Sequence, residues 1–128
     1  MIRLIALFSA ALLFGCTAQS KTVFIANFRN ACAYPVDITA HDYSNGKAAF
    51  AQPIHLKPGD HSEVLSYISP DDDIETSFPS TYRLDIAARG NIRSLNKPEL
   101  IQQLKQSDYL PKGNAIHTWT ISDSMLCP

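Results

Sequence analysis

The sequence predicts a mainly β protein with one domain, built as a β-sandwich or as a partly open barrel of about seven strands. Short segments rich in apolar and β-branched residues recur along the chain, separated by Gly, Pro and Asn residues. Only residues 97–106 carry the signals of a helix. Hydrophobic residues make up 45% of the chain and charged residues 18%, which is typical of a folded globular domain.

The first two predicted strands differ in their apolar pattern. Residues 23–28 are apolar at almost every position, which favours a strand that is buried on both faces. Residues 34–43 alternate, with Val36 and Ile38 on one face, which predicts a half-buried strand. The Asn-Gly pair in residues 44–47 then predicts a tight hairpin turn.

Two further strands are expected on either side of a Pro-Gly turn. Residues 48–56 read as a weak strand that Pro53 either splits or confines to a sheet edge. Residues 57–60 (Lys-Pro-Gly-Asp) have the composition of a β-turn. Residues 61–68 follow as another strand.

The central part of the chain contains a long connection and a hairpin. We expect residues 69–80 to connect strands, with a short extended piece at 74–78. Residues 82–89 alternate and predict a strand, and a turn at Gly90-Asn91 leads into a short strand over 92–95.

One helix is expected, inserted near residues 97–106. Asn96 occupies the N-cap position and Glu99 follows three residues later, which is the spacing of a capping box. The apolar stripe of this helix comprises Leu100, Ile101 and Leu104. Residues 111–114 break the chain, and residues 115–122 form the last predicted strand.

The sequence lacks the motifs of several function classes. The formal net charge of −1 gives no basic footprint for nucleic acid. There is no Gly-x-Ser-x-Gly elbow, no glycine-rich phosphate loop and no short histidine or cysteine spacing typical of a zinc site. We therefore expect a non-enzymatic protein without a cofactor.

The start of the chain has the features of an export signal. Arg3 precedes an eleven-residue apolar run, Leu4 to Phe14, which is too short to span a bilayer. The run ends in Leu13-Phe14-Gly15-Cys16, which resembles the lipobox of bacterial lipoproteins. The resemblance implies a signal peptide over 1–15, a lipidated Cys16 with a flexible tether over 16–22, and a single domain over 23–128.

The same resemblance implies a location. Thr17 follows the lipidated cysteine in place of the aspartate that, in lipoproteins of this kind, retains the protein in the inner membrane. The expected location is therefore the periplasmic face of the outer membrane, reached through a tether of at most about 20 Å. The expected partners are the membrane, through the lipid on Cys16, and an envelope protein, but no nucleic acid.

The chain contains three cysteines, Cys16, Cys32 and Cys127. If Cys16 carries lipid, the other two are left to form one disulfide in an oxidising compartment. Because bridged Cα atoms lie within about 7 Å of each other, the ends of the first and last strands must then share a pole. If these strands are neighbours they pair in parallel, as in immunoglobulin-like sandwiches, and the bridged pole faces away from the membrane.

Several polar residues remain as candidates for binding. His55 and His61 flank the Pro-Gly turn and would form a metal site only if they met across a hairpin. His117 shares a face with Trp119, which favours a partly buried, hydrogen-bonded histidine. The run Asp71-Asp72-Asp73 lacks the spacing of a calcium loop and reads as a solvated acidic segment, with weak cation binding as the alternative.

Four basic residues form a further pattern: Arg29, Lys57, Arg89 and Arg93. If successive strands alternate in direction, all four lie toward the bridged pole, while the three aspartates lie toward the membrane. Such a basic rim would suit an acidic partner. The expected function is therefore an outer-membrane-anchored binding or envelope-assembly module. The alternatives are a small-ligand or metal-binding lipoprotein and an envelope hydrolase.

Overall fold

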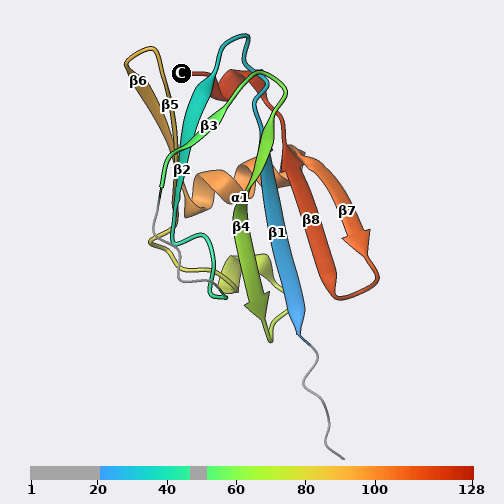
Figure 1. Cartoon of the computed structure of the whole chain (residues 1–128). Helices are drawn as coiled ribbons and strands as arrows, with labels where there is room; N and C mark the ends of the chain where they lie inside the picture. Colours follow the sequence, from blue (N-terminus) through green and yellow to red (C-terminus); the bar gives the residue numbers. More distant parts are fainter. Residues whose placement is uncertain (1–20, 47–51) are drawn as a thin grey trace, which may run out of the picture.

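The chain folds as a β-sandwich of two four-stranded sheets with one α-helix, in a computed structural model that describes residues 21–46 and 52–128 (Figure 1). The β1 sheet has the order β4-β1-β8-β7 and the β2 sheet has the order β3-β2-β5-β6. The predicted sandwich is thus confirmed, with eight strands in place of about seven. The predicted signal peptide and the lipobox with Cys16 lie outside the described residues.

The strands of the β1 sheet are β1 (Thr22–Arg29), β4 (His61–Ser69), β7 (Asp108–Lys112) and β8 (Ile116–Ile121). The strands of the β2 sheet are β2 (Val36–His41), β3 (Ile54–Leu56), β5 (Arg83–Ala88) and β6 (Asn91–Asn96). The helices are α1 (Lys97–Gln106) and the short 3-10 helices η1 (Ile74–Thr76) and η2 (Ser124–Leu126).

Strand β1 lies in the middle of its sheet, antiparallel to β4 and parallel to β8. Phe24, Ala26 and Phe28 point into the molecule and are buried. Val23 and Ile25 point the other way and are only half-buried. The prediction of burial on both faces is therefore wrong for the outer face, because a two-layer sandwich covers only one side of each sheet.

Strand β3 follows directly after Pro53 and forms an edge of the β2 sheet, as expected from the proline. The tight hairpin predicted at residues 44–47 is not formed between β2 and β3, because β2 ends at His41 and β3 begins at Ile54. Instead, Asn45 reaches β4, where its side chain exchanges hydrogen bonds with the backbone of Ile68. Here, hydrogen bonds to a distant strand take the place of the hairpin that the local turn propensity favours.

Helix α1 matches its prediction in both bounds and packing. Asn96 and Glu99 form the capping box, and Leu100, Ile101 and Leu104 are buried. Lys97, in the first turn, donates a hydrogen bond to the Phe78 carbonyl and lies over the Phe78 ring. No helix in residues 21–46 and 52–128 is long and apolar enough to cross a membrane.

Three local predictions differ from the structure. The extended piece expected at 74–78 is the 3-10 helix η1, because the Asp73 side chain caps it by accepting from the Glu75 N–H. The β5–β6 turn is Arg89-Gly90, one residue earlier than predicted. An additional strand, β7, lies between α1 and the last strand and extends over the first two residues of the break expected at 111–114. In an edge strand a proline such as Pro111 is tolerated when its nitrogen faces away from the ladder.

Candidate functional site

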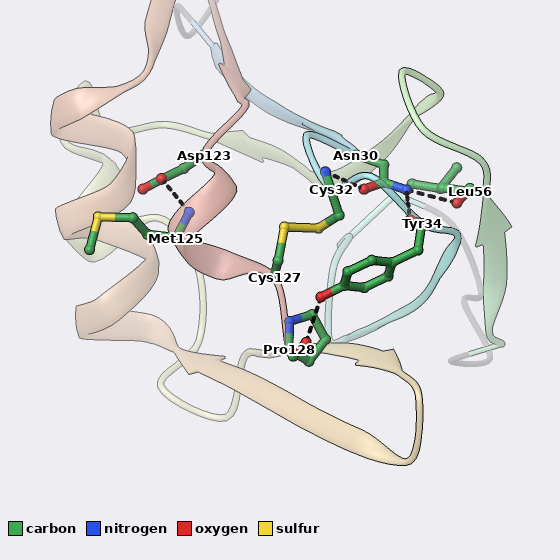
Figure 2. Close-up of a disulfide and its surroundings, with 8 residues drawn as sticks. All are labelled: Asn30, Cys32, Tyr34, Leu56, Asp123, Met125, Cys127 and Pro128. Carbon is green, nitrogen blue, oxygen red and sulfur yellow. Dashed lines mark hydrogen bonds between the residues drawn. A yellow bond between two sulfur atoms is a disulfide. The ribbon is translucent and has the colours of Figure 1, made fainter.

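The disulfide between Cys32 and Cys127 fastens one end of the sandwich (Figure 2). The two Cα atoms are 5.7 Å apart, and the cysteines follow β1 and η2, respectively. Because β1 and β8 are parallel, both strands end at this pole, as the cysteine arrangement predicts. We call the segments gathered there the stapled pole: residues 30–35, 57–60, 89–90 and 122–128. The start of β1, where residues 1–21 connect, lies at the opposite end (Figure 1).

A buried asparagine organises the stapled pole. The Asn30 side chain is 1% exposed, donates to the carbonyls of Tyr34 (2.9 Å) and Leu56 (3.0 Å), and accepts from the Cys32 N–H (2.8 Å). Its backbone N–H donates to the Asp60 carbonyl (2.8 Å). The side chain thus joins the loop after β1 to the end of β3 (Figure 2), and the backbone N–H adds the 57–60 turn. This role of Asn30 was not predicted from the sequence.

Within the stapled pole, Tyr34 connects the loop after β1 to the C-terminal segment and to the β5–β6 turn. Its hydroxyl donates to the Pro128 backbone oxygen (2.6 Å), and the Arg89 guanidinium lies 3.9 Å from the centre of its ring. A cation over an aromatic face is attracted by the ring quadrupole. The loops at this end are therefore held by the disulfide, the Asn30 hydrogen bonds and the Tyr34 contacts.

The four basic residues lie toward the stapled pole in two pairs. Arg29 and Lys57 are close to the β3–β4 turn, whereas Arg89 and Arg93 belong to the β5–β6 hairpin. None of the four forms an ion pair within the described part of the chain. Asp60 and Asp123 lie at the same end, so the pole carries both signs of charge. The four residues lie toward the pole where the basic rim was expected, and two carboxylates share that end.

A second polar cluster lies on the outer face of the β2 sheet, around Asp85. This carboxylate accepts hydrogen bonds from Ser94 (2.6 Å) and from Arg83 (3.1 Å), and lies 3.0 Å from His41 Nε2. Burial by itself would raise the pKa of Asp85, but the hydrogen bonds from Ser94 and His41 and the Arg83 charge together lower it. The cluster therefore stabilises an ionised aspartate.

This cluster resembles a catalytic triad only in composition. In a triad, the histidine accepts the proton of the serine and the aspartate orients the histidine. Here, Ser94 donates to Asp85, and no contact joins it to His41. A hydroxyl that donates to a carboxylate at the centre of the cluster is not activated as a nucleophile by the histidine. The chemistry that this geometry supports is charge stabilisation on a sheet face.

The histidines singled out from the sequence are placed apart. His55 Nδ1 lies 2.8 Å from Asp37 in the β2 sheet, whereas His61 begins β4 in the β1 sheet. Among the described residues, no three metal-ligating side chains gather in one place. His117 is stacked on Phe24 and Trp119, as its predicted position on that face suggests.

The acidic run has local structural roles at the end opposite the stapled pole. Asp73 caps η1, and Asp72 lies 3.5 Å from His117 Nε2. That nitrogen is buried, although the His117 side chain as a whole is 20% exposed, and no hydrogen-bond partner satisfies it. The Tyr109 hydroxyl binds the other ring nitrogen of His117. The three aspartates therefore lie where strand alternation predicted.

Comparison of the chain with models of protein families, with curated proteins and with solved structures finds no match.

Proposed function

We propose that the protein is a lipoprotein anchored at the periplasmic face of the outer membrane, where it acts as a non-enzymatic binding or assembly module. The lipobox resemblance at Leu13 to Cys16 supports the anchor. The observation that carries the binding role is that the two ends of the sandwich differ. Residues 1–21 join one end of β1, and the disulfide-linked loops lie at the other end.

That arrangement is suited to presenting loops to a partner. A stable sheet scaffold holds recognition loops in place, so that little conformational entropy is lost on binding. The stapled pole adds a disulfide and a fully hydrogen-bonded Asn30 to this scaffold. Its cationic side chains at Lys57 and Arg89 are without ion-pair partners in the described residues and remain available to an acidic partner.

The anchor is tested by fatty-acid labelling. Cells that produce the full chain and its Cys16→Ser variant are grown with radiolabelled palmitate, and their membranes are separated by density. We expect the wild-type chain to carry label and to fractionate with the outer membrane, and the variant to carry none. Label in the Cys16→Ser variant would refute lipidation at this residue.

The binding role is tested by crosslinking in living cells. A photoreactive amino acid is placed at Lys57 or Arg89 on the stapled pole and, as a matched control, at Lys112 near the opposite end. We expect protein adducts of defined mass from the two pole positions and fewer from Lys112. Equal labelling from all three positions would contradict recognition through the pole.

A further inference from the structure

The four exposed sheet edges differ in how their backbone groups are used. At the β4 edge, the Ser66 N–H donates to the Tyr43 carbonyl and the Ile68 N–H donates to the Asn45 side chain. That edge is therefore occupied by residues 43–45. The β3 edge is only three residues long. Neither offers a continuous row of free hydrogen-bonding groups.

The β7 edge is interrupted by a proline. The Val23 N–H donates to the Ala115 carbonyl. Because backbone groups alternate in direction along a strand, this bond determines which residues of β8 point their N–H and C=O groups toward β1. His117 and Trp119 then point their backbone groups toward β1, whereas Thr118 pairs with Leu110 of β7. The outward positions of β7 are consequently Tyr109 and Pro111, and Pro111 has no N–H to donate. This is a known protection of edge strands.

The β6 edge contains no proline, and no other described segment forms backbone hydrogen bonds with Ile92 or Ser94. Arg89 and Gly90 both have positive φ (56° and 79°), as in the type I′ turn of a two-residue hairpin. The pair Ala88–Asn91, which flanks the turn, then exchanges two backbone hydrogen bonds, and so does every second pair farther along the β5–β6 hairpin. The backbone groups of Ile92 and Ser94 therefore point away from β5. The Asn96 N–H follows the same alternation and reaches the Glu99 side chain.

The side chains along β6 suit a partner strand. Ile92 is 70% exposed and borders a surface hollow of 270 Å³ beside the β5–β6 turn. Arg93 is exposed and forms no ion pair with any described residue. Figure 1 shows β6 at the outer side of the molecule, with its free edge toward solvent and its hairpin at the stapled pole.

We propose that the β6 edge binds an extended segment of an envelope protein by strand addition, with an acidic residue of that segment beside Arg93. The added strand would pair with the backbone groups of Ile92 and Ser94 and extend the β2 sheet to five strands. An apolar side chain of the segment would cover Ile92. This inference rests on the proposed binding function, extends the binding surface from the stapled pole to the adjoining β6 edge, and names a kind of partner.

The first measurement uses amide hydrogen exchange on the full chain, purified in detergent with Cys16→Ser so that no lipid is present. Alone, the amides of Ile92 and Ser94 should exchange fast and those of Arg93 and Leu95 slowly. The probe is the capped hexapeptide Thr-Val-Glu-Val-Thr-Val, with the Glu→Lys peptide as the control. Binding of the Glu peptide should slow exchange at Ile92 and Ser94. The Lys peptide should have a weaker effect.

Two matched variants separate backbone pairing from side-chain contact. Ile92→Pro removes an outward N–H and leaves the β5–β6 ladder intact, whereas Ile92→Thr keeps that N–H. We expect Ile92→Pro to weaken binding of the Glu peptide about tenfold, the equivalent of one lost hydrogen bond of roughly 1.4 kcal/mol, and Ile92→Thr to weaken it less. Arg93→Glu should reverse the preference between the two peptides.

Three results would overturn the proposal. The first is slow exchange at Ile92 and Ser94 in the dilute protein alone. The second is protection that grows with protein concentration and without peptide, which would assign the edge to a second copy of the chain. The third is peptide binding that Ile92→Pro leaves unchanged. None of these depends on lipidation, so this proposal and the proposed anchor can fail separately.

Discussion

At the scale of single residues, the stapled pole depends on one polar side chain in an apolar setting. Asn30 satisfies both of its side-chain amide hydrogens and its side-chain oxygen with backbone groups of Cys32 and Tyr34 in its own loop and of Leu56 in β3. Buried polar groups are tolerated when they are paired in this way, and are costly when a partner is removed. Asn30 is therefore a specific determinant of how the loops at this pole are arranged.

We predict that Asn30→Ala lowers the free energy of unfolding by about 3 kcal/mol, because the carbonyls of Tyr34 and Leu56 and the Cys32 N–H lose their partner. Urea denaturation followed by circular dichroism measures the change. The control is Asn91→Ala at an exposed position, for which we expect a change within about 0.5 kcal/mol. Equal effects of the two substitutions would show that the Asn30 hydrogen bonds are unimportant for stability.

Asp85 predicts a pH dependence of stability. Its pKa is lower in the folded protein than in the unfolded chain. Between the two pKa values, the folded state therefore binds fewer protons than the unfolded state. Its stabilising contribution is complete above the ordinary aspartate pKa of about 4 and is lost as the pH falls through the lower folded value. We expect the melting temperature of Asp85→Asn to fall less steeply than that of wild type below about pH 4.

The control for this prediction is Asp37→Asn, which removes an exposed carboxylate on the same sheet face with a single histidine partner. It leaves the hydrogen bonds from Ser94 and Arg83 to Asp85 in place, so the difference between the two variants isolates the contribution of those bonds. If Asp85→Asn and wild type lose stability in parallel as the pH falls, the hydrogen bonds around Asp85 do not shift its titration.

At the scale of elements, prediction from sequence succeeded where local signals and packing agree. The cap at Asn96 and the apolar stripe of α1 specify the same ten residues that the structure shows as helix. Prediction failed at β7, because Pro111 reads locally as a break, whereas only the sheet reveals an edge position that tolerates it. The Asn45-Gly46 pair has a strong turn propensity, yet Asn45 is used to cover the β4 edge.

The openness of the β6 edge is another property of elements that local sequence does not reveal. The alternation of Ile92 and Ser94 away from β5 follows from the turn at Arg89-Gly90, which the sequence places one residue too late. A shift of one residue would exchange the inward and outward groups of the strand. Which backbone groups of β6 are free is therefore decided by the register of the hairpin and not by the residues of the strand.

At the scale of the whole molecule, the disulfide joins segments that are 95 residues apart in the chain. Closing so long a loop restricts the unfolded chain much more than the folded one. The chain-entropy model gives an upper value of about 4.6 kcal/mol for the resulting stabilisation of the folded state. The parallel pairing of β1 and β8 brings the same two segments together independently of the bond. The bridge therefore reinforces a contact that the sheet already makes.

We predict that the double variant Cys32→Ala/Cys127→Ala is folded at 25 °C but unfolds at a lower urea concentration, with a loss of roughly 2–4 kcal/mol. Reduced wild type serves as the control, since it lacks the bond but keeps both cysteines, and should unfold close to the double variant. Indistinguishable urea midpoints for the oxidised and reduced proteins would mean that the disulfide contributes nothing to stability.

The sequence by itself determined the β class, the position and caps of α1 and, if Cys16 carries lipid, the pairing of Cys32 with Cys127. The β class follows from residue periodicity and the helix from capping chemistry, both of which act over a few neighbouring residues. The cysteine pairing follows by exclusion from the number of cysteines. Only the tertiary structure decided the two-sheet order, the role of Asn30, the Asp85 cluster and the open β6 edge. Each of these depends on the register between strands distant in sequence, which is fixed by packing the whole core at once.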